Sequence, residues 1–318
     1  MSDIILITGG LGYLGGRIAR WLSENTAYSI RIADLAVRAK TPDWLRGEIV
    51  QADLTSEDDM RRVCQDVRHV VHLAALNEID SAREPDRALL VNTLAAARLV
   101  RCASEAGAEK FLYFSTAHVY GAPLTGTIAE TTLPRPVHPY AMTHYAAEQY
   151  VLAARDLGQI EGIVVRLSNG IGAPADPAVS RWTLVGNDLC RQAVTNRELI
   201  LKSSGMQQRD FITLEDTARG VEHLLTIPRE AAQDGLFNLG GACSFSIYEV
   251  TQRIAARCKA VLGFEPPISR QPPGPNEQSQ LLDYRIDKLQ ATGFELTGDL
   301  DQEIDDTIRL CQSAFTQY

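Results

Sequence analysis

The sequence predicts an α/β fold, a doubly wound parallel sheet followed by a smaller C-terminal lobe. Short apolar runs alternate with segments of helical periodicity through the first half of the 318 residues, as in sheets whose parallel strands are joined by helices. The first apolar run leads directly into a glycine-rich turn, and beyond about residue 167 the alternation becomes irregular. We therefore expect residues 1–167 to form the sheet domain, with segments near 209–240 returning to it, and residues 168–318 to form most of the lobe.

The expected elements of the first half follow in order. Apolar runs predict strands at residues 4–7, 29–33, 48–50, 69–73, 110–114 and 162–166. Helical spacing begins at residue 16, and Ser56 can cap a helix that ends near residue 65. A long helix is expected from about Pro85 to Ala106, with Gly107 as its stop. Prolines and threonines at 123–139 mark a loop before a helix over about 140–157.

The second half is less regular. Helices are predicted over 182–195, 214–225 and from Ser246 to about Val261, and strands over 210–212 and 236–239. Five prolines between residues 266 and 280 predict a loop. Ligands of open α/β sheets bind at the carboxyl ends of the strands. We therefore expect the lobe to lean over that edge.

Composition limits the classes of function. The net charge of −9, without any basic block, gives no support for a nucleic-acid or membrane-surface partner. No apolar run approaches the roughly 20 residues of a membrane span, and no signal-like segment opens the chain. Six scattered cysteines without a C-x-x-C pair are typical of reduced thiols in a cytoplasmic protein. No metal is expected, because no group of His, Cys, Asp or Glu has ligand spacing.

The glycine turn predicts a bound dinucleotide. The glycines of residues 9–15 lie between a strand and a helix, the Rossmann-like arrangement in which helix amides meet a pyrophosphate and the backbone approaches it closely. Asp34 ends the second strand, where a carboxylate accepts ribose hydroxyls and repels a 2′-phosphate. NAD is therefore expected, although Arg31 and Arg38 nearby leave NADP open.

With these residues the chain resembles the extended short-chain dehydrogenase/reductase family, in particular its nucleotide-sugar epimerases and dehydratases. Residues 8–15 (TGGLGYLG) are similar to the family's cofactor turn, and residues 114–121 (FSTAHVYG) to the segment with the catalytic hydroxyl. The resemblance covers most of the chain and implies a substrate-binding C-terminal lobe. It also implies that NAD is bound by Gly9, Gly12, Tyr13, Leu14, Gly15, Asp34, Asp53, Leu54, Leu73, Ala74, Ala75, Asn92, Tyr140 and His144.

The resemblance also assigns the substrate side. Residues 166–172 and 208–212 are similar to stretches that grip a substrate diphosphate, and arginine matches phosphate by bidentate hydrogen bonding. A surface ion pair of Arg209 with Asp210 or Glu215 is the competing interpretation. The implied substrate-binding residues are Thr116, His118, Asn169, Arg209 and Arg270.

The implied catalytic residues are Thr116, Tyr140 and His144. Tyr140 would act as the base, and Thr116 would orient a substrate hydroxyl. The family places a Lys one turn after the Tyr, whose charge lowers the tyrosine pKa. This chain has His144 there, YxxxH in place of YxxxK. Glu148, one turn further, is expected to hold His144 protonated or to fix its tautomer.

The resulting hypothesis is an NAD-dependent nucleotide-sugar epimerase, acting at sugar C4 through a transient keto intermediate. The family's dehydratases carry Asp-Glu after the catalytic Thr, where this chain has Ala117 and His118. A dehydrogenase, reductase or dehydratase on a nucleotide sugar or another alcohol stays an alternative. So does a catalytically impaired NAD-binding structural or regulatory protein. A homodimer is expected through the helices over 85–106 and 140–157.

Overall fold

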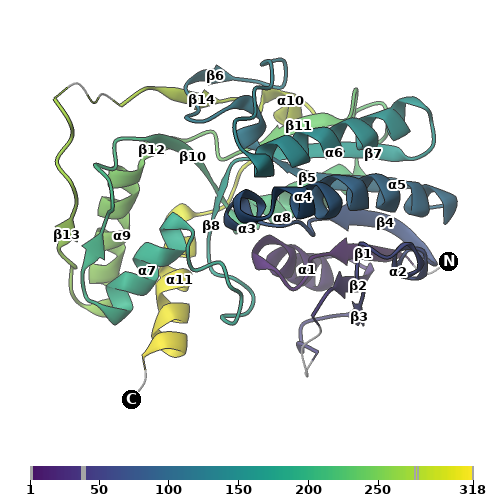
Figure 1. Cartoon of the computed structure of the whole chain (residues 1–318). Coiled ribbons are helices and arrows are strands. Elements are labelled where there is room, and N and C mark those ends of the chain that lie inside the picture. Colours follow the sequence, from purple (N-terminus) through teal and green to yellow (C-terminus); the bar gives the residue numbers. More distant parts are fainter. Residues whose placement is uncertain (1–2, 37–40, 276, 278, 317–318) are drawn as a thin grey trace.

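A computed structural model describes residues 3–36, 41–275, 277 and 279–316 (Figure 1), so Arg38 lies outside the described residues. Its main sheet has seven strands, all paired in parallel, in the order β11-β7-β5-β4-β1-β2-β3. The order reverses between β1 and β4, which opens a crevice at the carboxyl ends of these strands. The predicted doubly wound sheet is confirmed. Its strands are β1 (Ile4–Thr8), β2 (Ser29–Asp34), β3 (Gly47–Gln51), β4 (Val67–His72), β5 (Lys110–Thr116), β7 (Glu161–Leu167) and β11 (Leu236–Leu239).

Helices cover both faces of this sheet, because successive side chains of a buried strand point to opposite sides. Ile5 and Ile7 of β1 share one core with α1 (Tyr13–Asn25) and α8 (Leu214–Thr226). Leu6, between them, belongs to the core of the opposite face. That core is completed by the helices α2 (Glu57–Val63), α5 (Ala95–Glu105) and α6 (Pro139–Asp156).

The long helix predicted over residues 85–106 contains a π-helical turn. It runs as α4 (Pro85–Ala88), the π-turn η1 (Leu89–Leu94) and α5, and Gly107 follows with φ +82°. Asn92 lies in the π-turn and is 1% exposed. Its amide contacts Leu76 and Thr143, so the wider turn accompanies an inward-facing polar side chain.

The C-terminal lobe is built on α7 (Val185–Thr195), α9 (Ile247–Leu262) and α11 (Leu300–Phe315), which share a separate apolar core and lie together in Figure 1. The predicted helix over 182–195 thus begins only at Val185. The predicted strand over 210–212 belongs to a small sheet of the lobe and not to the main one. This sheet contains β8 (Asn169–Ile171), β10 (Gln208–Thr213) and β12 (Ser244–Ser246).

Short elements complete the chain. Strands β6 (Gly126–Ile128) and β14 (Leu282–Tyr284) pair with each other, as do β9 (Leu199–Ile200) and β13 (Ile268–Ser269). Strand β13 interrupts the loop predicted over 266–280. The remaining short helices are α3 (Glu78–Arg83), η2 (Ala117–Tyr120) and α10 (Asp287–Gln290).

Segments far along the chain return to the main sheet. Strand β11 pairs with β7, and α8 packs against α1. The strand β7 ends at Leu167 and β8 begins at Asn169, so the first strand of the lobe starts at the carboxyl edge of the main sheet. This connection sets the lobe beside the crevice.

Candidate functional site

A cavity of about 540 Å³ lies at the carboxyl edge of the sheet, beneath the lobe. It brings together the glycine turn, the end of β5, the first turns of α6 and the start of the lobe. Of the residues singled out in the sequence, those that line it are Gly9, Gly12, Tyr13, Leu14, Gly15, Asp34, Leu73, Ala75, Thr116, His118, Tyr140, His144, Asn169 and Arg209. Side chains separated by up to 200 residues thus face one space.

The glycine turn leaves no room for side chains. Gly9 has φ +67°, and a Cβ there would lie 2.9 Å from the amide nitrogen of Ala74. A Cβ on Gly15 would lie 2.2 Å from the carbonyl oxygen of Gly9. Gly12 begins α1 without a side-chain cap from any described residue, so the first amides of the helix are left for a ligand. The residues present therefore fit the pyrophosphate of a dinucleotide.

Asp34 lies next to this turn. Its Oδ2 accepts a hydrogen bond of 3.3 Å from the amide of Leu11. The carboxylate is thus held beside the start of α1, as expected for a group that accepts ribose hydroxyls.

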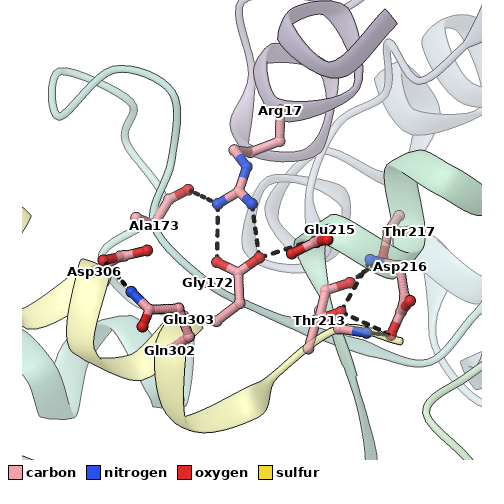
Figure 2. Close-up of polar contacts among 12 residues, drawn as sticks. Arg17, Gly172, Ala173, Thr213, Glu215, Asp216, Thr217, Gln302, Glu303 and Asp306 are labelled. Atoms are coloured by element: carbon pink, nitrogen blue, oxygen red, sulfur yellow. Dashed lines mark hydrogen bonds and ion pairs between the residues drawn. The ribbon is translucent and has the colours of Figure 1, made fainter. Parts of the chain in front are cut away.

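The helix α1 is anchored to the lobe by a partly buried ion pair (Figure 2). Arg17 donates to both carboxylate oxygens of Glu303 on α11, at 2.7 and 2.9 Å, and to the carbonyl of Ala173 at 2.9 Å. The same carboxylate accepts the amide of Glu215 on α8. Tyr13 adds a hydrogen bond of 2.9 Å from its hydroxyl to the carbonyl of Gly172, so this hydroxyl ties α1 to the lobe.

Four predicted cofactor residues lie behind or beside the cavity. Ala74 packs its backbone against Gly9. Asn92 accepts the amide of Leu76 at 2.7 Å and so fixes the loop that lines the cavity. The last two are Asp53 and Leu54. Asp53 accepts the amide and hydroxyl of Thr55, and Leu54 packs against the core. Their predicted contacts with a cofactor stay predictions.

Tyr140 and Thr116 both line the cavity. Thr116 ends β5, and Tyr140 lies in the first turn of α6. Burial raises the pKa of the Tyr140 phenol, and the charge of Glu78 raises it further, whereas the charge of Arg181 and the Thr116 side chain lower it. The hydroxyl is therefore a proton donor at neutral pH unless a ligand or a proton acceptor changes its surroundings.

His144 lies one turn beyond Tyr140, with the two ring centroids 4.4 Å apart. Burial lowers the pKa of His144 to about 4, although the carbonyl of Phe114 and the charge of Glu78 raise it somewhat. The imidazole is therefore neutral at pH 7. Its Nδ1 lies 2.8 Å from the hydroxyl of Tyr113.

The expectation that Glu148 supports His144 is wrong. The carboxylate of Glu148 is fully buried and binds Arg166, at 2.6 Å from Nη2 and 3.0 Å from Nε. It also accepts the hydroxyl of Ser115. Because β5 and β7 are neighbours, Ser115 and Arg166 pair across them and both face α6. Arg166, which lies within a stretch expected to hold a diphosphate, thus neutralises a buried carboxylate instead.

Arg209 and Asn169 form the opposite wall. Nη1 of Arg209 donates to Oδ1 of Asn169 at 3.3 Å, and Asn169 donates to the carbonyl of Asp210 at 2.9 Å. Nε of Arg209 is buried without a hydrogen-bond partner among the described residues. Asp210 accepts the amides of Gly241 and Cys243, and no ion pair joins it to Arg209 within the described ranges. The guanidinium is thus placed for an anionic ligand.

His118 and Arg270 have different surroundings. Burial lowers the pKa of His118 to about 4, and the charges of Arg209 and His138 add to this effect. Nδ1 of His118 has no hydrogen-bond partner in the described part of the chain. Arg270 stacks on Tyr248, 3.6 Å from the ring centroid, and is not among the residues that line the cavity.

Sequence reasoning missed one charged pair at this cavity. Glu78 begins α3, and Arg181 lies in the segment that leads to α7; their side chains meet at 3.2 Å. Both line the cavity, and both charges act on Tyr140. Neither residue belongs to a recognisable sequence motif, so no signal in the sequence marked this pair.

The described residues contain neither a metal-binding cluster nor a membrane-spanning helix. In that part of the chain, no cluster of three or more His, Cys, Asp and Glu side chains is placed to hold a metal ion. None of the described helices is long and apolar enough to cross a membrane.

Known proteins resemble this chain over most of its length. The model of the NAD dependent epimerase/dehydratase family matches residues 5–240. The chain is 27% identical to a putative UDP-glucose 4-epimerase of Methanocaldococcus jannaschii over 304 residues, 95% of this chain and 96% of that protein. It is 29% identical to a dTDP-glucose 4,6-dehydratase of Neisseria gonorrhoeae over 274 residues, 79% and 77% of the two chains.

Solved structures share the fold. A UDP-glucose 4-epimerase of Thermotoga maritima superposes with a TM-score of 0.81 at 22% identity, covering 98% of this chain and 100% of that one. The epimerase Mth375 of Methanothermobacter thermautotrophicus gives a TM-score of 0.83 at 22% identity, covering 98% and 95%.

Proposed function

Since this chain belongs to the NAD dependent epimerase/dehydratase family, an NAD-dependent group of the extended short-chain dehydrogenase/reductase type, we propose that it is a nucleotide-sugar 4-epimerase. The predicted cofactor agrees with the family. One observation carries the proposal: Thr116, Tyr140 and Arg209 line a single cavity with the glycine turn. A reactive hydroxyl pair and an anion-binding arginine therefore face the same ligand space.

The residues of the turn fit NAD. The close packing of Gly9 and Gly15, the open start of α1 and the carboxylate of Asp34 would hold its pyrophosphate and adenosine ribose. When bound, NAD supplies a hydride acceptor that can return the hydride in the same catalytic cycle.

Tyr140 takes the proton of the sugar hydroxyl at C4, and Thr116 orients that hydroxyl. A base must lie within hydrogen-bond reach of its proton, and Tyr140 and Thr116 line the same cavity, where the Thr116 side chain acts on the phenol of Tyr140. The charge of Arg181 and the Thr116 side chain favour the phenolate, against the effects of burial and of Glu78. After the transient keto sugar turns, Tyr140 returns the proton to the opposite epimer.

Arg209 and Asn169 hold the diphosphate of the substrate. The unpaired Nε of Arg209 and the free part of its guanidinium suit phosphate oxygens. Relatives named for UDP- and dTDP-sugars favour a nucleoside-diphosphate hexose as the ligand. His118 contacts the sugar from η2. Arg270, stacked on Tyr248, contacts the nucleotide end.

We also propose a cytoplasmic homodimer. Large apolar side chains are exposed on η1 and α6: Leu90 is 53% exposed, Leu94 39%, Met142 48% and Tyr150 55%. Burial of such a patch stabilises a self-association. Ala95 on α5 and Ala147 on α6 are buried within the chain and do not reach this surface.

Cofactor release and thermal shift test the proposed function. Denatured protein is expected to release NAD, and UDP- or dTDP-hexoses are expected to raise the melting temperature by mass action. Absence of any shift with nucleotide sugars would reject the substrate class. A product lighter by one water would replace the epimerase with a dehydratase.

A further inference from the structure

Tyr113 and His144 form a buried pair behind the proposed catalytic tyrosine. The hydroxyl of Tyr113, on β5, lies 2.8 Å from Nδ1 of His144 on α6. The two residues are 2% and 4% exposed. His144 lines the cavity, and its ring meets that of Tyr140 edge to face. The pair therefore links the central sheet to the group that stands where a lysine is usual.

The direction of this hydrogen bond follows from counting donors and acceptors. The hydroxyl of Tyr113 makes no hydrogen bond to any described residue other than His144, and Nε2 of His144 is buried without a partner in the described part of the molecule. If Tyr113 donates to Nδ1, only the Nε2–H is left over. If Nδ1–H donates instead, both the phenolic proton and the Nε2 lone pair are unmet. The second arrangement leaves one more buried polar group unmet and is therefore the costlier one.

Both groups keep their protonation at working pH. Burial raises the pKa of Tyr113, and the charges of Glu148 and Tyr140 add to this. Burial likewise keeps His144 neutral. Tyr113 is thus a permanent donor, and the imidazole can carry only one proton.

We propose that Tyr113 is a positioning residue that holds neutral His144 with its proton on Nε2. Because Nδ1 is bound to the sheet, Nε2–H is the donor left for a ligand in the cavity, next to Tyr140. A ribose hydroxyl of the dinucleotide is the matching acceptor. The tautomer is a property of this chain alone, whereas its use toward the ribose rests on the proposed function.

The substitution of lysine by histidine then changes the kind of help that Tyr140 receives. A lysine ammonium donates hydrogen bonds and supplies a charge, and this neutral imidazole donates without the charge. Tyr113 also holds the ring of His144 in one orientation, whereas a long lysine side chain would be free to rotate. A short, neutral group can thus donate a hydrogen bond at this position.

Nitrogen-15 NMR of the histidine rings tests the tautomer directly. The chain has six histidines, and His144→Gln identifies the signal that belongs to position 144. We expect the pattern of an Nε2–H imidazole, unchanged between pH 6 and 8. An Nδ1–H pattern, or a titration in this range, would overturn the proposal without touching the proposed reaction.

Tyr113→Phe tests the positioning role. We expect its His144 signals to shift toward a mixture of tautomers, with turnover roughly fivefold lower, as for loss of one neutral hydrogen bond. The matched control is Tyr284→Phe, which removes a buried hydroxyl that bonds the carbonyl of Arg166 at 2.7 Å, away from the cavity lining. The control should leave the His144 signals unchanged.

Two results would overturn the role of Tyr113. One is a Tyr113→Phe protein, folded by its melting curve, whose His144 spectrum matches the wild type. The other is an equal shift in Tyr284→Phe. If the spectra behave as expected but no nucleotide sugar is turned over, the proposed function fails and the tautomer stands.

Discussion

Replacing His144 by lysine should move the acidic limb of the pH–rate profile to lower pH. Tyr140 acts as a base only when deprotonated, and its pKa is raised by burial. The structure offers no cation at position 144, because burial keeps the imidazole neutral. An ammonium at this position would favour the phenolate and therefore lower the pKa of Tyr140.

The magnitude follows from the short distance between the two side chains. The ring centroids of Tyr140 and His144 lie 4.4 Å apart. A unit charge about 5 Å from the phenolate oxygen stabilises it by about 3 kcal/mol at an effective dielectric constant of about 20. One pKa unit corresponds to about 1.36 kcal/mol, so the limb should move by about 2 pH units.

The assay is kcat against pH with a nucleotide hexose, for the wild type, His144→Lys and His144→Met. Methionine is unbranched and uncharged and only one atom shorter than lysine, so it controls for the loss of the imidazole and its bond to Tyr113. We expect only the lysine variant to shift the limb, with activity at neutral pH preserved or raised. Identical limbs for the lysine and methionine variants would refute the electrostatic reasoning.

Three further outcomes follow from the same geometry. Tyr140→Phe should lower kcat by roughly 10²–10⁴-fold, the range of general acid–base catalysis, while NAD content and sugar binding persist; unchanged turnover would exclude Tyr140 as the base. Arg209→Ala should weaken nucleotide-sugar binding by roughly 10–100-fold through lost charged hydrogen bonds, measured by calorimetry, whereas Arg253→Ala, which removes an ion pair with α11, should not. His72 and His144, whose pKa values burial lowers to about 3 and about 4, bind protons more weakly in the folded than in the unfolded chain. The contribution of these two histidines to stability should therefore be complete above the unfolded pKa near 6.5 and be lost as pH drops from there toward 4. A melting temperature that does not change over this window, or the same slope in His144→Gln, would contradict this.

The parts of the site that sequence alone predicts are those that local backbone geometry demands. The glycines of residues 9–15 are required by contacts within the turn and with Ala74, so their spacing is visible in the chain. Asp34 and Thr116 end strands and Tyr140 lies in the first turn of a helix, where position along one element fixes their place.

The parts that escaped prediction depend on packing between distant elements. Glu148 lies one helical turn from His144, and this spacing predicted a contact between them. The register of β5 and β7 instead places Ser115 and Arg166 beside the Glu148 carboxylate. In the sequence, Tyr113 is one of several core residues of a buried strand. Its contact with His144 depends on how α6 packs over β5.

The fate of the hydrogen at sugar C4 tests the central claim most directly. A UDP- or dTDP-hexose deuterated at C4 is incubated with the protein, and the product is analysed by NMR and mass spectrometry. Hydride exchange within one active site predicts the C4 epimer with its deuterium retained at C4. Loss of the deuterium to solvent, or binding of the nucleotide sugar without formation of the epimer, would contradict the account.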